Sequence, residues 1–257
     1  MMWDYFIYYS LLALLLWIAG VVSLYLFKKE LIGKALIIAG IIVFSLFIGK
    51  LWLEQGYAPL KTMGDTRLWY SLFIILVGFF TYLRWRYKWL VGYSTIVSAV
   101  FIIINLLKPE LHKTNLMPAL QSVWFVPHVT VYILSYALLG AATIASLIAI
   151  KEERKENRRL LPLIDNLVYI GVGFLMLGML MGAVWAKEAW GDYWSWDPKE
   201  IWAFITASAY LVYIHARLRR YNLKYILWLL PVAFMLLMIT WIGVNYLPAA
   251  QGSIHVY

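Results

Sequence analysis

The sequence contains no cysteine among its 257 residues. Disulfide bonds, thiolate metal sites and thiol redox chemistry by this chain are therefore excluded. Charged residues are also scarce, at 14% of the chain, and there are only four histidines. For that reason the positions of these few side chains are informative about function.

Hydrophobic residues make up 64% of the chain, whereas ordinary soluble domains are close to half apolar. Apolar runs of about twenty residues recur along the sequence, and each can cross a hydrocarbon core of about 30 Å as a helix. We therefore predict an integral membrane protein, which excludes a soluble or nucleic-acid-binding role despite the net charge of +9. The first run is too long for a signal peptide and no basic segment precedes it, so we do not expect cleavage.

We expect an all-α bundle of about eight membrane-spanning helices. They cover residues 5–27, 31–50, 68–84, 89–107, 128–150, 164–186, 200–216 and 225–247. Fifteen of the twenty-two basic residues lie in alternate links, at 28–34, 84–88, 151–159 and 217–224. The positive-inside rule places these links on the cytoplasmic side of the inner membrane. Both termini and the links 50–67, 108–127 and 187–200 are then predicted to lie on the outer, periplasmic side.

The simplest domain description is one transmembrane domain over residues 1–257. Its first part, 1–110, holds N-terminal spans, and 111–257 holds the segments with candidate functional residues. The outer segment 109–127 mixes Leu, Met and Trp with few charges, which predicts a short amphipathic helix in the membrane interface.

The span 164–186 contains Gly171, Gly173, Gly178 and Gly182. Small residues spaced four apart allow a neighbouring backbone to approach closely in a membrane. We interpret these glycines as helix-packing positions.

The four histidines differ in their predicted positions. His128 and His255 are both external and each lies beside a helix end. A single histidine at such a place is often an interface residue, but two neutral imidazoles can supply both axial ligands of a haem iron. His215 lies within a span, where an ionisable group is a functional hypothesis by default. If it binds a metal centre there, the second ligand comes from another polypeptide or is absent. His112 lies in the outer interfacial segment 109–127.

The segment 190–200 reads WGDYWSWDPKE. Asp197 at the N-cap, Pro198 at the first helical position and Glu200 at the third predict a helix that begins near Pro198. Aromatic residues also form belts at membrane interfaces. Four aromatic residues surround one glycine turn, which is more than an interfacial belt requires: Trp190, Tyr193, Trp194 and Trp196. Such a cluster favours a platform for a large planar ligand such as a porphyrin.

Together with this segment, three further stretches carry a family resemblance: LMPALQSVWFVPHVTVYILSYALL (116–139), YLVYIHARL (210–218) and the tail GSIHVY (252–257). Over about residues 116–257 the chain resembles the CcsA family, also called ResC, the haem-handling subunit of the System II cytochrome c synthase. In the loop before residue 74 the sequence departs from the family pattern.

The resemblance implies a role for each matching residue. His128 and His255 would be the external axial ligands of haem b, and His215 would be a ligand of a membrane-embedded entry site. The loop residues Trp190, Gly191, Tyr193, Trp194, Trp196 and Asp197 would contact the haem. A separate CcsB (ResB) partner would supply the second ligand of the entry site.

The implied activity is haem transfer from the cytoplasmic side to the external site. There an apocytochrome c with a Cys-x-x-Cys-His motif would receive it through thioether bonds. The chain would then be a subunit of a cytochrome c synthase, or haem lyase, and the sequence leaves open whether bond formation is catalysed or templated.

Three alternatives were weighed against this interpretation. A System I protein that loads a haem chaperone shares a tryptophan-rich loop, but it has six spans, and Pro-Lys-Glu follows Trp-Asp here. A di-haem cytochrome b electron carrier needs two histidines on one helix, and no predicted span has two. A solute transporter predicts paired broken helices in corresponding halves, which the sequence does not show.

Overall fold

Helices are the only regular secondary structure in the part of the chain that the computed structural model describes, residues 2–112, 122–151 and 154–248. Eight helices are long and apolar enough to cross a membrane. They are α1 (Phe6–Tyr25), α2 (Glu30–Gln55), α3 (Met63–Trp85), α4 (Trp89–Leu107), α5 (Phe125–Lys151), α6 (Arg154–Trp190), α7 (Pro198–Leu218) and α8 (Leu223–Trp241). Short 3-10 helices cover Met2–Tyr5, Pro109–His112 and Gly243–Tyr246. The predicted all-α membrane protein is confirmed.

The largest departures from the predicted spans are at the start of α6 and at the end of α8. Helix α6 has 37 residues, about 55 Å at the usual rise, although the apolar run predicted only 164–186. The helix begins at Arg154 because charged residues continue it beyond the apolar stretch, and hydropathy detects only that stretch. Helix α8 ends at Trp241 rather than near 247, and a 3-10 turn beginning at Gly243 follows it. Glycine is a poor helix former, which accounts for the earlier end.

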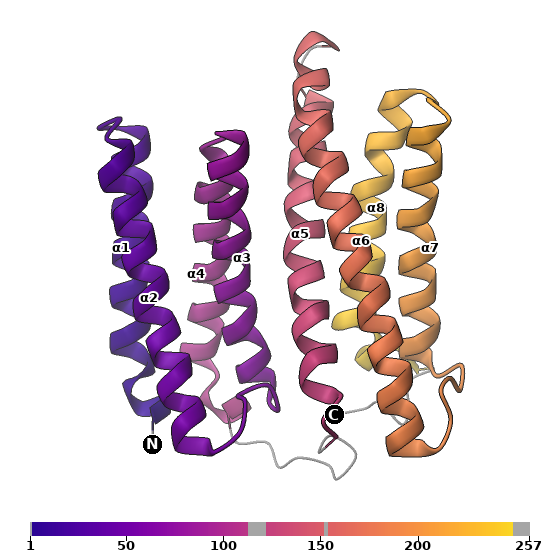
Figure 1. Cartoon of the computed structure of the whole chain (residues 1–257), viewed down its shortest axis with the longest axis horizontal. Helices are drawn as coiled ribbons and strands as arrows, with labels where there is room; N and C mark the ends of the chain where they lie inside the picture. Colours follow the sequence, from indigo (N-terminus) through magenta and orange to yellow (C-terminus); the bar gives the residue numbers. More distant parts are fainter. Residues whose placement is uncertain (1, 113–121, 152–153, 249–257) are drawn as a thin grey trace. The chain divides into compact units, whose positions relative to one another are not determined.

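The chain divides into two compact units, Met1–Gln121 and Ser122–Tyr257. Each unit contains four of the long helices, joined as two successive hairpins (Figure 1). The units are described separately below. The single-domain description over 1–257 stays a prediction.

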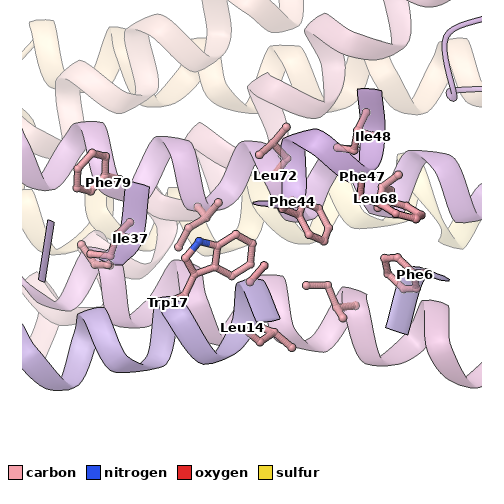
Figure 2. Close-up of a cluster of buried hydrophobic side chains, with 14 of the residues drawn as sticks. Phe6, Leu14, Trp17, Ile37, Phe44, Phe47, Ile48, Leu68, Leu72 and Phe79 are labelled. Atoms are coloured by element: carbon pink, nitrogen blue, oxygen red, sulfur yellow. The ribbon is translucent and has the colours of Figure 1, made fainter. Parts of the chain in front are cut away.

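The core of the first unit forms where α1 and α2 pack closely. Trp17 is fully buried over Gly40, where an added Cβ would lie 2.5 Å from the indole Nε1. Phe44 and Phe47 of α2 continue this core toward Phe6 (Figure 2). Large aromatic side chains fill the space between these helices because the glycine leaves room for the largest of them.

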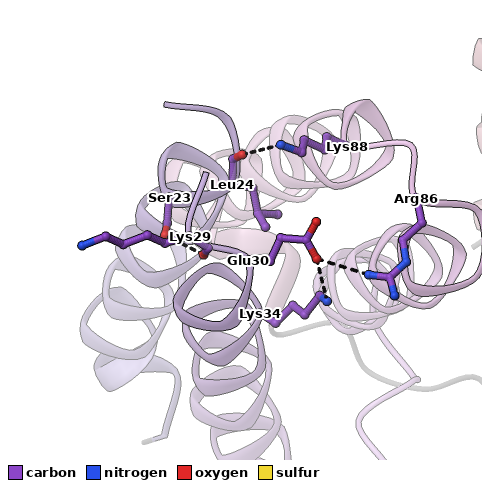
Figure 3. A network of polar contacts seen from close by, with 7 residues as sticks. All are labelled: Ser23, Leu24, Lys29, Glu30, Lys34, Arg86 and Lys88. Carbon is purple, nitrogen blue, oxygen red and sulfur yellow. Dashed lines mark hydrogen bonds and ion pairs between the residues drawn. The ribbon is translucent and has the colours of Figure 1, made fainter. Parts of the chain in front are cut away.

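Polar contacts bring the two basic turns of the first unit to the same end. The Lys88 ammonium donates to the Leu24 carbonyl at 2.7 Å, which ties the start of α4 to the end of α1 (Figure 3). Glu30 at the start of α2 binds Lys34 at 3.1 Å and Arg86 after α3 at 3.3 Å. The basic links 28–34 and 84–88 therefore share one end of this unit, as the predicted alternation requires.

In the second unit, α5 packs against α6 and α8, and α7 packs against α8. The Ser135 hydroxyl of α5 donates to the Gly171 carbonyl of α6 at 2.7 Å. The Thr206 and Thr240 hydroxyls join α7 to α8 at 2.9 Å. These contacts satisfy hydroxyl groups that would otherwise be unpaired among apolar side chains.

The glycines of α6 accommodate side chains of α5. An added Cβ would lie 2.7 Å from Leu139 at Gly171 and 2.8 Å from Tyr132 at Gly178. Gly173 faces open space, with no atom within 4 Å of an added Cβ. The packing interpretation thus holds for Gly171 and Gly178, although side chains of α5 approach these glycines rather than its backbone. It is wrong for Gly173.

Candidate functional site

His128 lies in the first turn of α5, with its ring against α6. Its Nδ1 is 2.8 Å from the Gly178 carbonyl oxygen. A carbonyl oxygen can only accept, so Nδ1 carries the hydrogen and donates it. In a neutral imidazole the lone pair is then on Nε2, which is the nitrogen that a metal would need.

Aromatic rings continue from His128 in both directions within the second unit. The His128 ring is 4.7 Å from the Tyr132 ring, edge to face, and 5.6 Å from the Trp185 ring. Trp185 in turn meets Trp190 at 4.8 Å and Phe125 at 5.5 Å. His128 is therefore one member of a continuous aromatic cluster that reaches the loop after α6.

The loop 191–197 connects α6 to α7 and is held from both sides. Gly191 has a φ of 93°, in the left-handed region that glycine adopts without strain, and its carbonyl accepts from Lys187 at 2.5 Å. At the other end, one Glu200 carboxylate oxygen accepts from the backbone N–H groups of Ser195 at 2.8 Å and Asp197 at 3.1 Å. The loop conformation is thus fixed by the two helices that it joins.

Asp197 caps α7 as the sequence predicts. Its Oδ1 accepts from the Lys199 backbone N–H at 3.0 Å, and Glu200 completes a capping box. Helix α7 begins at Pro198. The predicted N-terminus and the structural role of Asp197 are both confirmed.

The tryptophans of this loop have different surroundings. Trp196 is 63% exposed and has a φ of 59°, which is unusual for a bulky residue. Its ring lies 5.8 Å from that of Trp194, edge to face. The indole Nε1 of Trp194 is buried without a hydrogen-bond partner. Tyr193 is exposed, with the Lys187 ammonium 5.4 Å from its ring.

His215 has an exposed side chain in the last turn of α7. Its Nδ1 is 3.0 Å from the Leu211 carbonyl, one turn earlier in the same helix. In this unit the side chain therefore faces outward from the helix bundle, where lipid or another polypeptide would meet it.

Asp165 in α6 is a polar residue that sequence reasoning missed. Its carboxylate accepts from the Tyr213 hydroxyl at 2.8 Å and binds the Arg217 guanidinium through two bonds, at 2.8 and 2.5 Å. A lone acid in an apolar span was the available signal, since such residues are rare and usually paired. Both partners are on α7, so this cluster ties α6 to α7 near His215.

The other two histidines are His112 and His255. His112 stacks on Trp3 at 3.7 Å in the first unit, so its ring contributes to packing there. His255 lies outside the described residues. Within the described part of the chain, no group of three or more His, Asp or Glu side chains could hold a metal ion.

Comparison with known proteins adds family membership to this geometry. The family described as cytochrome c assembly protein matches residues 5–250. The protein named cytochrome c biogenesis protein CcsA in Guillardia theta is 32% identical, over 84% of this chain and 83% of its own length. CcsA of Welwitschia mirabilis is 36% identical over 66% of this chain and 68% of its own. CcsA of Mesostigma viride is 29% identical over 89% of this chain and 86% of its own length. This chain therefore belongs to the cytochrome c assembly protein family, with CcsA proteins as relatives, and takes part in cytochrome c biogenesis.

Proposed function

We propose that this chain binds haem b as a substrate and presents it to apocytochrome c. His128 and His255 are the axial ligands of the external site, and the aromatic loop supports the ring. The observation that carries this proposal is the His128 hydrogen bond to the Gly178 carbonyl, 2.8 Å long. It places the lone pair of the neutral ring on Nε2, and metal-ligating histidines usually donate their other nitrogen in this way.

The loop offers what a porphyrin needs besides an axial ligand. Trp190 and Trp185 lie edge to face next to His128, and exposed Trp196 stands beyond Trp194. Flat aromatic surface stabilises a planar ligand by stacking and by burial of apolar area. A propionate carboxylate would supply the acceptor that the buried Trp194 N–H lacks. The residues present therefore fit haem.

The chemistry requires positioning more than strong catalysis. Each cysteine thiol of the Cys-x-x-Cys-His motif adds across one vinyl C=C bond of haem. One C–S bond and one C–H bond form, while the S–H bond and the C=C π bond are lost, so no oxidant is consumed. The motif histidine replaces one of the two chain imidazoles on the iron. Holding the reactants in the right orientation lowers the barrier to such an addition.

The entry site requires a second protein. His215 faces outward from its unit on α7, so a ligand from a CcsB-type partner would have to complete an iron site there. The proposed path runs from this cytoplasmic-side histidine to the external pair His128 and His255.

Spectroscopy of the purified complex tests the proposal. The chain is purified with its candidate CcsB-type partner, and haem content and the low-spin absorption spectrum are recorded. Replacing either external ligand, His128→Ala or His255→Ala, is expected to remove the external site's share of the bis-histidine low-spin signal, because one axial bond at that site is lost.

His112→Ala is the matched control, because that ring stacks on Trp3 and is assigned no iron. Its low-spin signal should stay at the wild-type level. An unchanged spectrum in both the His128 and His255 variants would overturn the proposal.

A further inference from the structure

Gly182 of α6 lies directly against the ring of His128, and we propose that it is a positioning residue for that ligand, acting with Gly178. The inference rests on the proposed function, since it assigns these glycines to the same haem site. Gly182 sets the plane of the imidazole, and Gly178 sets its hydrogen bond. Both then determine how Nε2 is aimed.

The geometry at Gly182 leaves no room for a methyl group. A Cβ there would lie 2.7 Å from Cε1 and 2.9 Å from Nδ1 of His128, but 3.7 Å from Nε2. Contacts shorter than 3.0 Å are not tolerated, so the ring would have to move. The same three distances show that the Nδ1–Cε1 edge faces α6 and that Nε2 lies farther from it.

Gly178 fixes the ring from one turn earlier on α6. Its carbonyl accepts the Nδ1 hydrogen bond, and a Cβ on it would lie 2.8 Å from Cδ1 of Tyr132. The Tyr132 ring is 4.7 Å from the His128 ring, edge to face. His128 is therefore held between Tyr132 and the glycine-lined surface of α6, and it has little freedom to turn.

A displaced imidazole has a defined consequence for iron binding. Groups that orient a metal-ligating histidine typically contribute 10- to 100-fold to metal affinity. A methyl group at Gly182 would turn the ring and lengthen the Gly178 hydrogen bond, since both depend on the same close approach. Haem affinity and the low-spin spectrum should change together.

The opposing interpretation is that these glycines serve only helix packing, and α6 contains controls for it. Gly171 is equally crowded, because a Cβ there would lie 2.7 Å from Leu139, but no histidine atom is among its near neighbours. Gly173 has no atom within 4 Å of an added Cβ. Gly171→Ala therefore measures the effect of disturbed helix packing alone. Gly173→Ala measures the effect of a glycine-to-alanine change that meets no neighbour.

The experiment compares Gly182→Ala, Gly171→Ala and Gly173→Ala in the haem-loaded complex, at matched amounts of folded protein. We expect Gly182→Ala to bind haem at least about tenfold more weakly and to shift the low-spin electron paramagnetic resonance signal. The two control variants should keep the wild-type spectrum. Tyr132→Ala removes atoms and so creates no clash with α6. It should broaden the same low-spin signal, because the His128 ring is then free to turn.

The outcomes separate the two proposals. If the wild-type complex binds haem and Gly182→Ala behaves like Gly171→Ala, with Tyr132→Ala unchanged, the positioning role is overturned and the haem site stands. If neither His128→Ala nor His255→Ala changes the wild-type spectrum, the proposed function itself fails.

Discussion

Two histidines of this chain make different contacts because their surroundings differ. His128 donates through Nδ1 to the Gly178 carbonyl, which places the lone pair of the neutral ring on Nε2. His112 instead stacks flat on Trp3. The sequence predicted that His128 stands at a helix start, but it could not predict that Gly178 and Gly182 would enclose its ring. Those contacts join residues about fifty positions apart, which no local pattern encodes.

The pKa of His112 provides a prediction at this scale. Burial lowers this pKa below its usual value of 6.5, and the Arg67 charge adds to that effect, although the Asn105 carbonyl and Glu110 oppose it. Between the folded and unfolded pKa values the unfolded state binds more protons, so stability rises with pH. We expect the contribution of the neutral His112 ring to folding stability to be complete above about pH 6.5 and to decline as the pH falls.

Thermal unfolding of the purified protein between mildly acidic and neutral pH measures this effect. The wild-type midpoint should fall more steeply on acidification than that of His112→Gln, whose side chain does not titrate. Parallel curves for the two proteins would contradict the assignment.

At the scale of single elements, a local sequence signal predicted the start of α7 but not the start of α6. The start of α7 at Pro198 followed from Asp197 and Glu200, because a capping box involves only neighbouring residues. The start of α6 at Arg154 did not follow, since charged residues can continue a helix past its apolar run. The tie between α6 and α7 through Asp165 also required the folded structure, because its partners lie about fifty residues away.

The Asp165 cluster should contribute substantially to the stability of the second unit. Asp165 and Arg217 side chains are only 18% and 21% exposed, so water replaces the lost bonds poorly. Asp165→Asn is expected to lower the free energy of unfolding by about 1.5–3 kcal/mol, the usual size for hydrogen bonds to a charged group. Removing both charges, Asp165→Leu with Arg217→Leu, should cost less than removing one.

Chemical denaturation in mixed micelles measures these free energies of unfolding, and Glu30→Gln serves as the comparison for Asp165→Asn. The Glu30–Arg86 pair is 50% and 62% exposed, and exposed ion pairs contribute little to stability. Equal costs for the Asp165 and Glu30 variants would show that the α6–α7 cluster is no stronger than a surface pair.

At the scale of the whole molecule, the apolar runs predicted the helix count, and the alternation of basic links predicted the grouping of turns. Lys88 and Leu24 bring the two basic turns of the first unit together, as this alternation requires. Within the described residues, the basic turns also use left-handed backbone at Lys28, Arg86 and Arg220. The sequence signal was strong here because it depends on charge counts rather than on particular contacts.

The absence of cysteine makes the proposed sidedness directly testable. Each introduced thiol would be unique, since the chain has none of its own. In intact cells, a membrane-impermeant maleimide should label Ser195→Cys in the aromatic loop. Lys29→Cys and Arg220→Cys should react only after the membrane is opened, because the positive-inside rule places their turns in the cytoplasm.

The cysteine-free wild-type chain gives the background of this labelling, and full labelling after opening confirms that each thiol is accessible. Reaction of Lys29→Cys in intact cells, with Ser195→Cys protected, would invert the proposed orientation and place His128 on the wrong side for an external cytochrome.

An experimental structure of the complex with its CcsB-type partner and bound haem tests the central claim most directly. The account predicts one external iron bound by Nε2 of His128 on one face and by His255 on the other, above the loop from Trp190 to Trp196. A structure in which His128 and His255 are too far apart to share an iron atom, in every state of the complex, would contradict it.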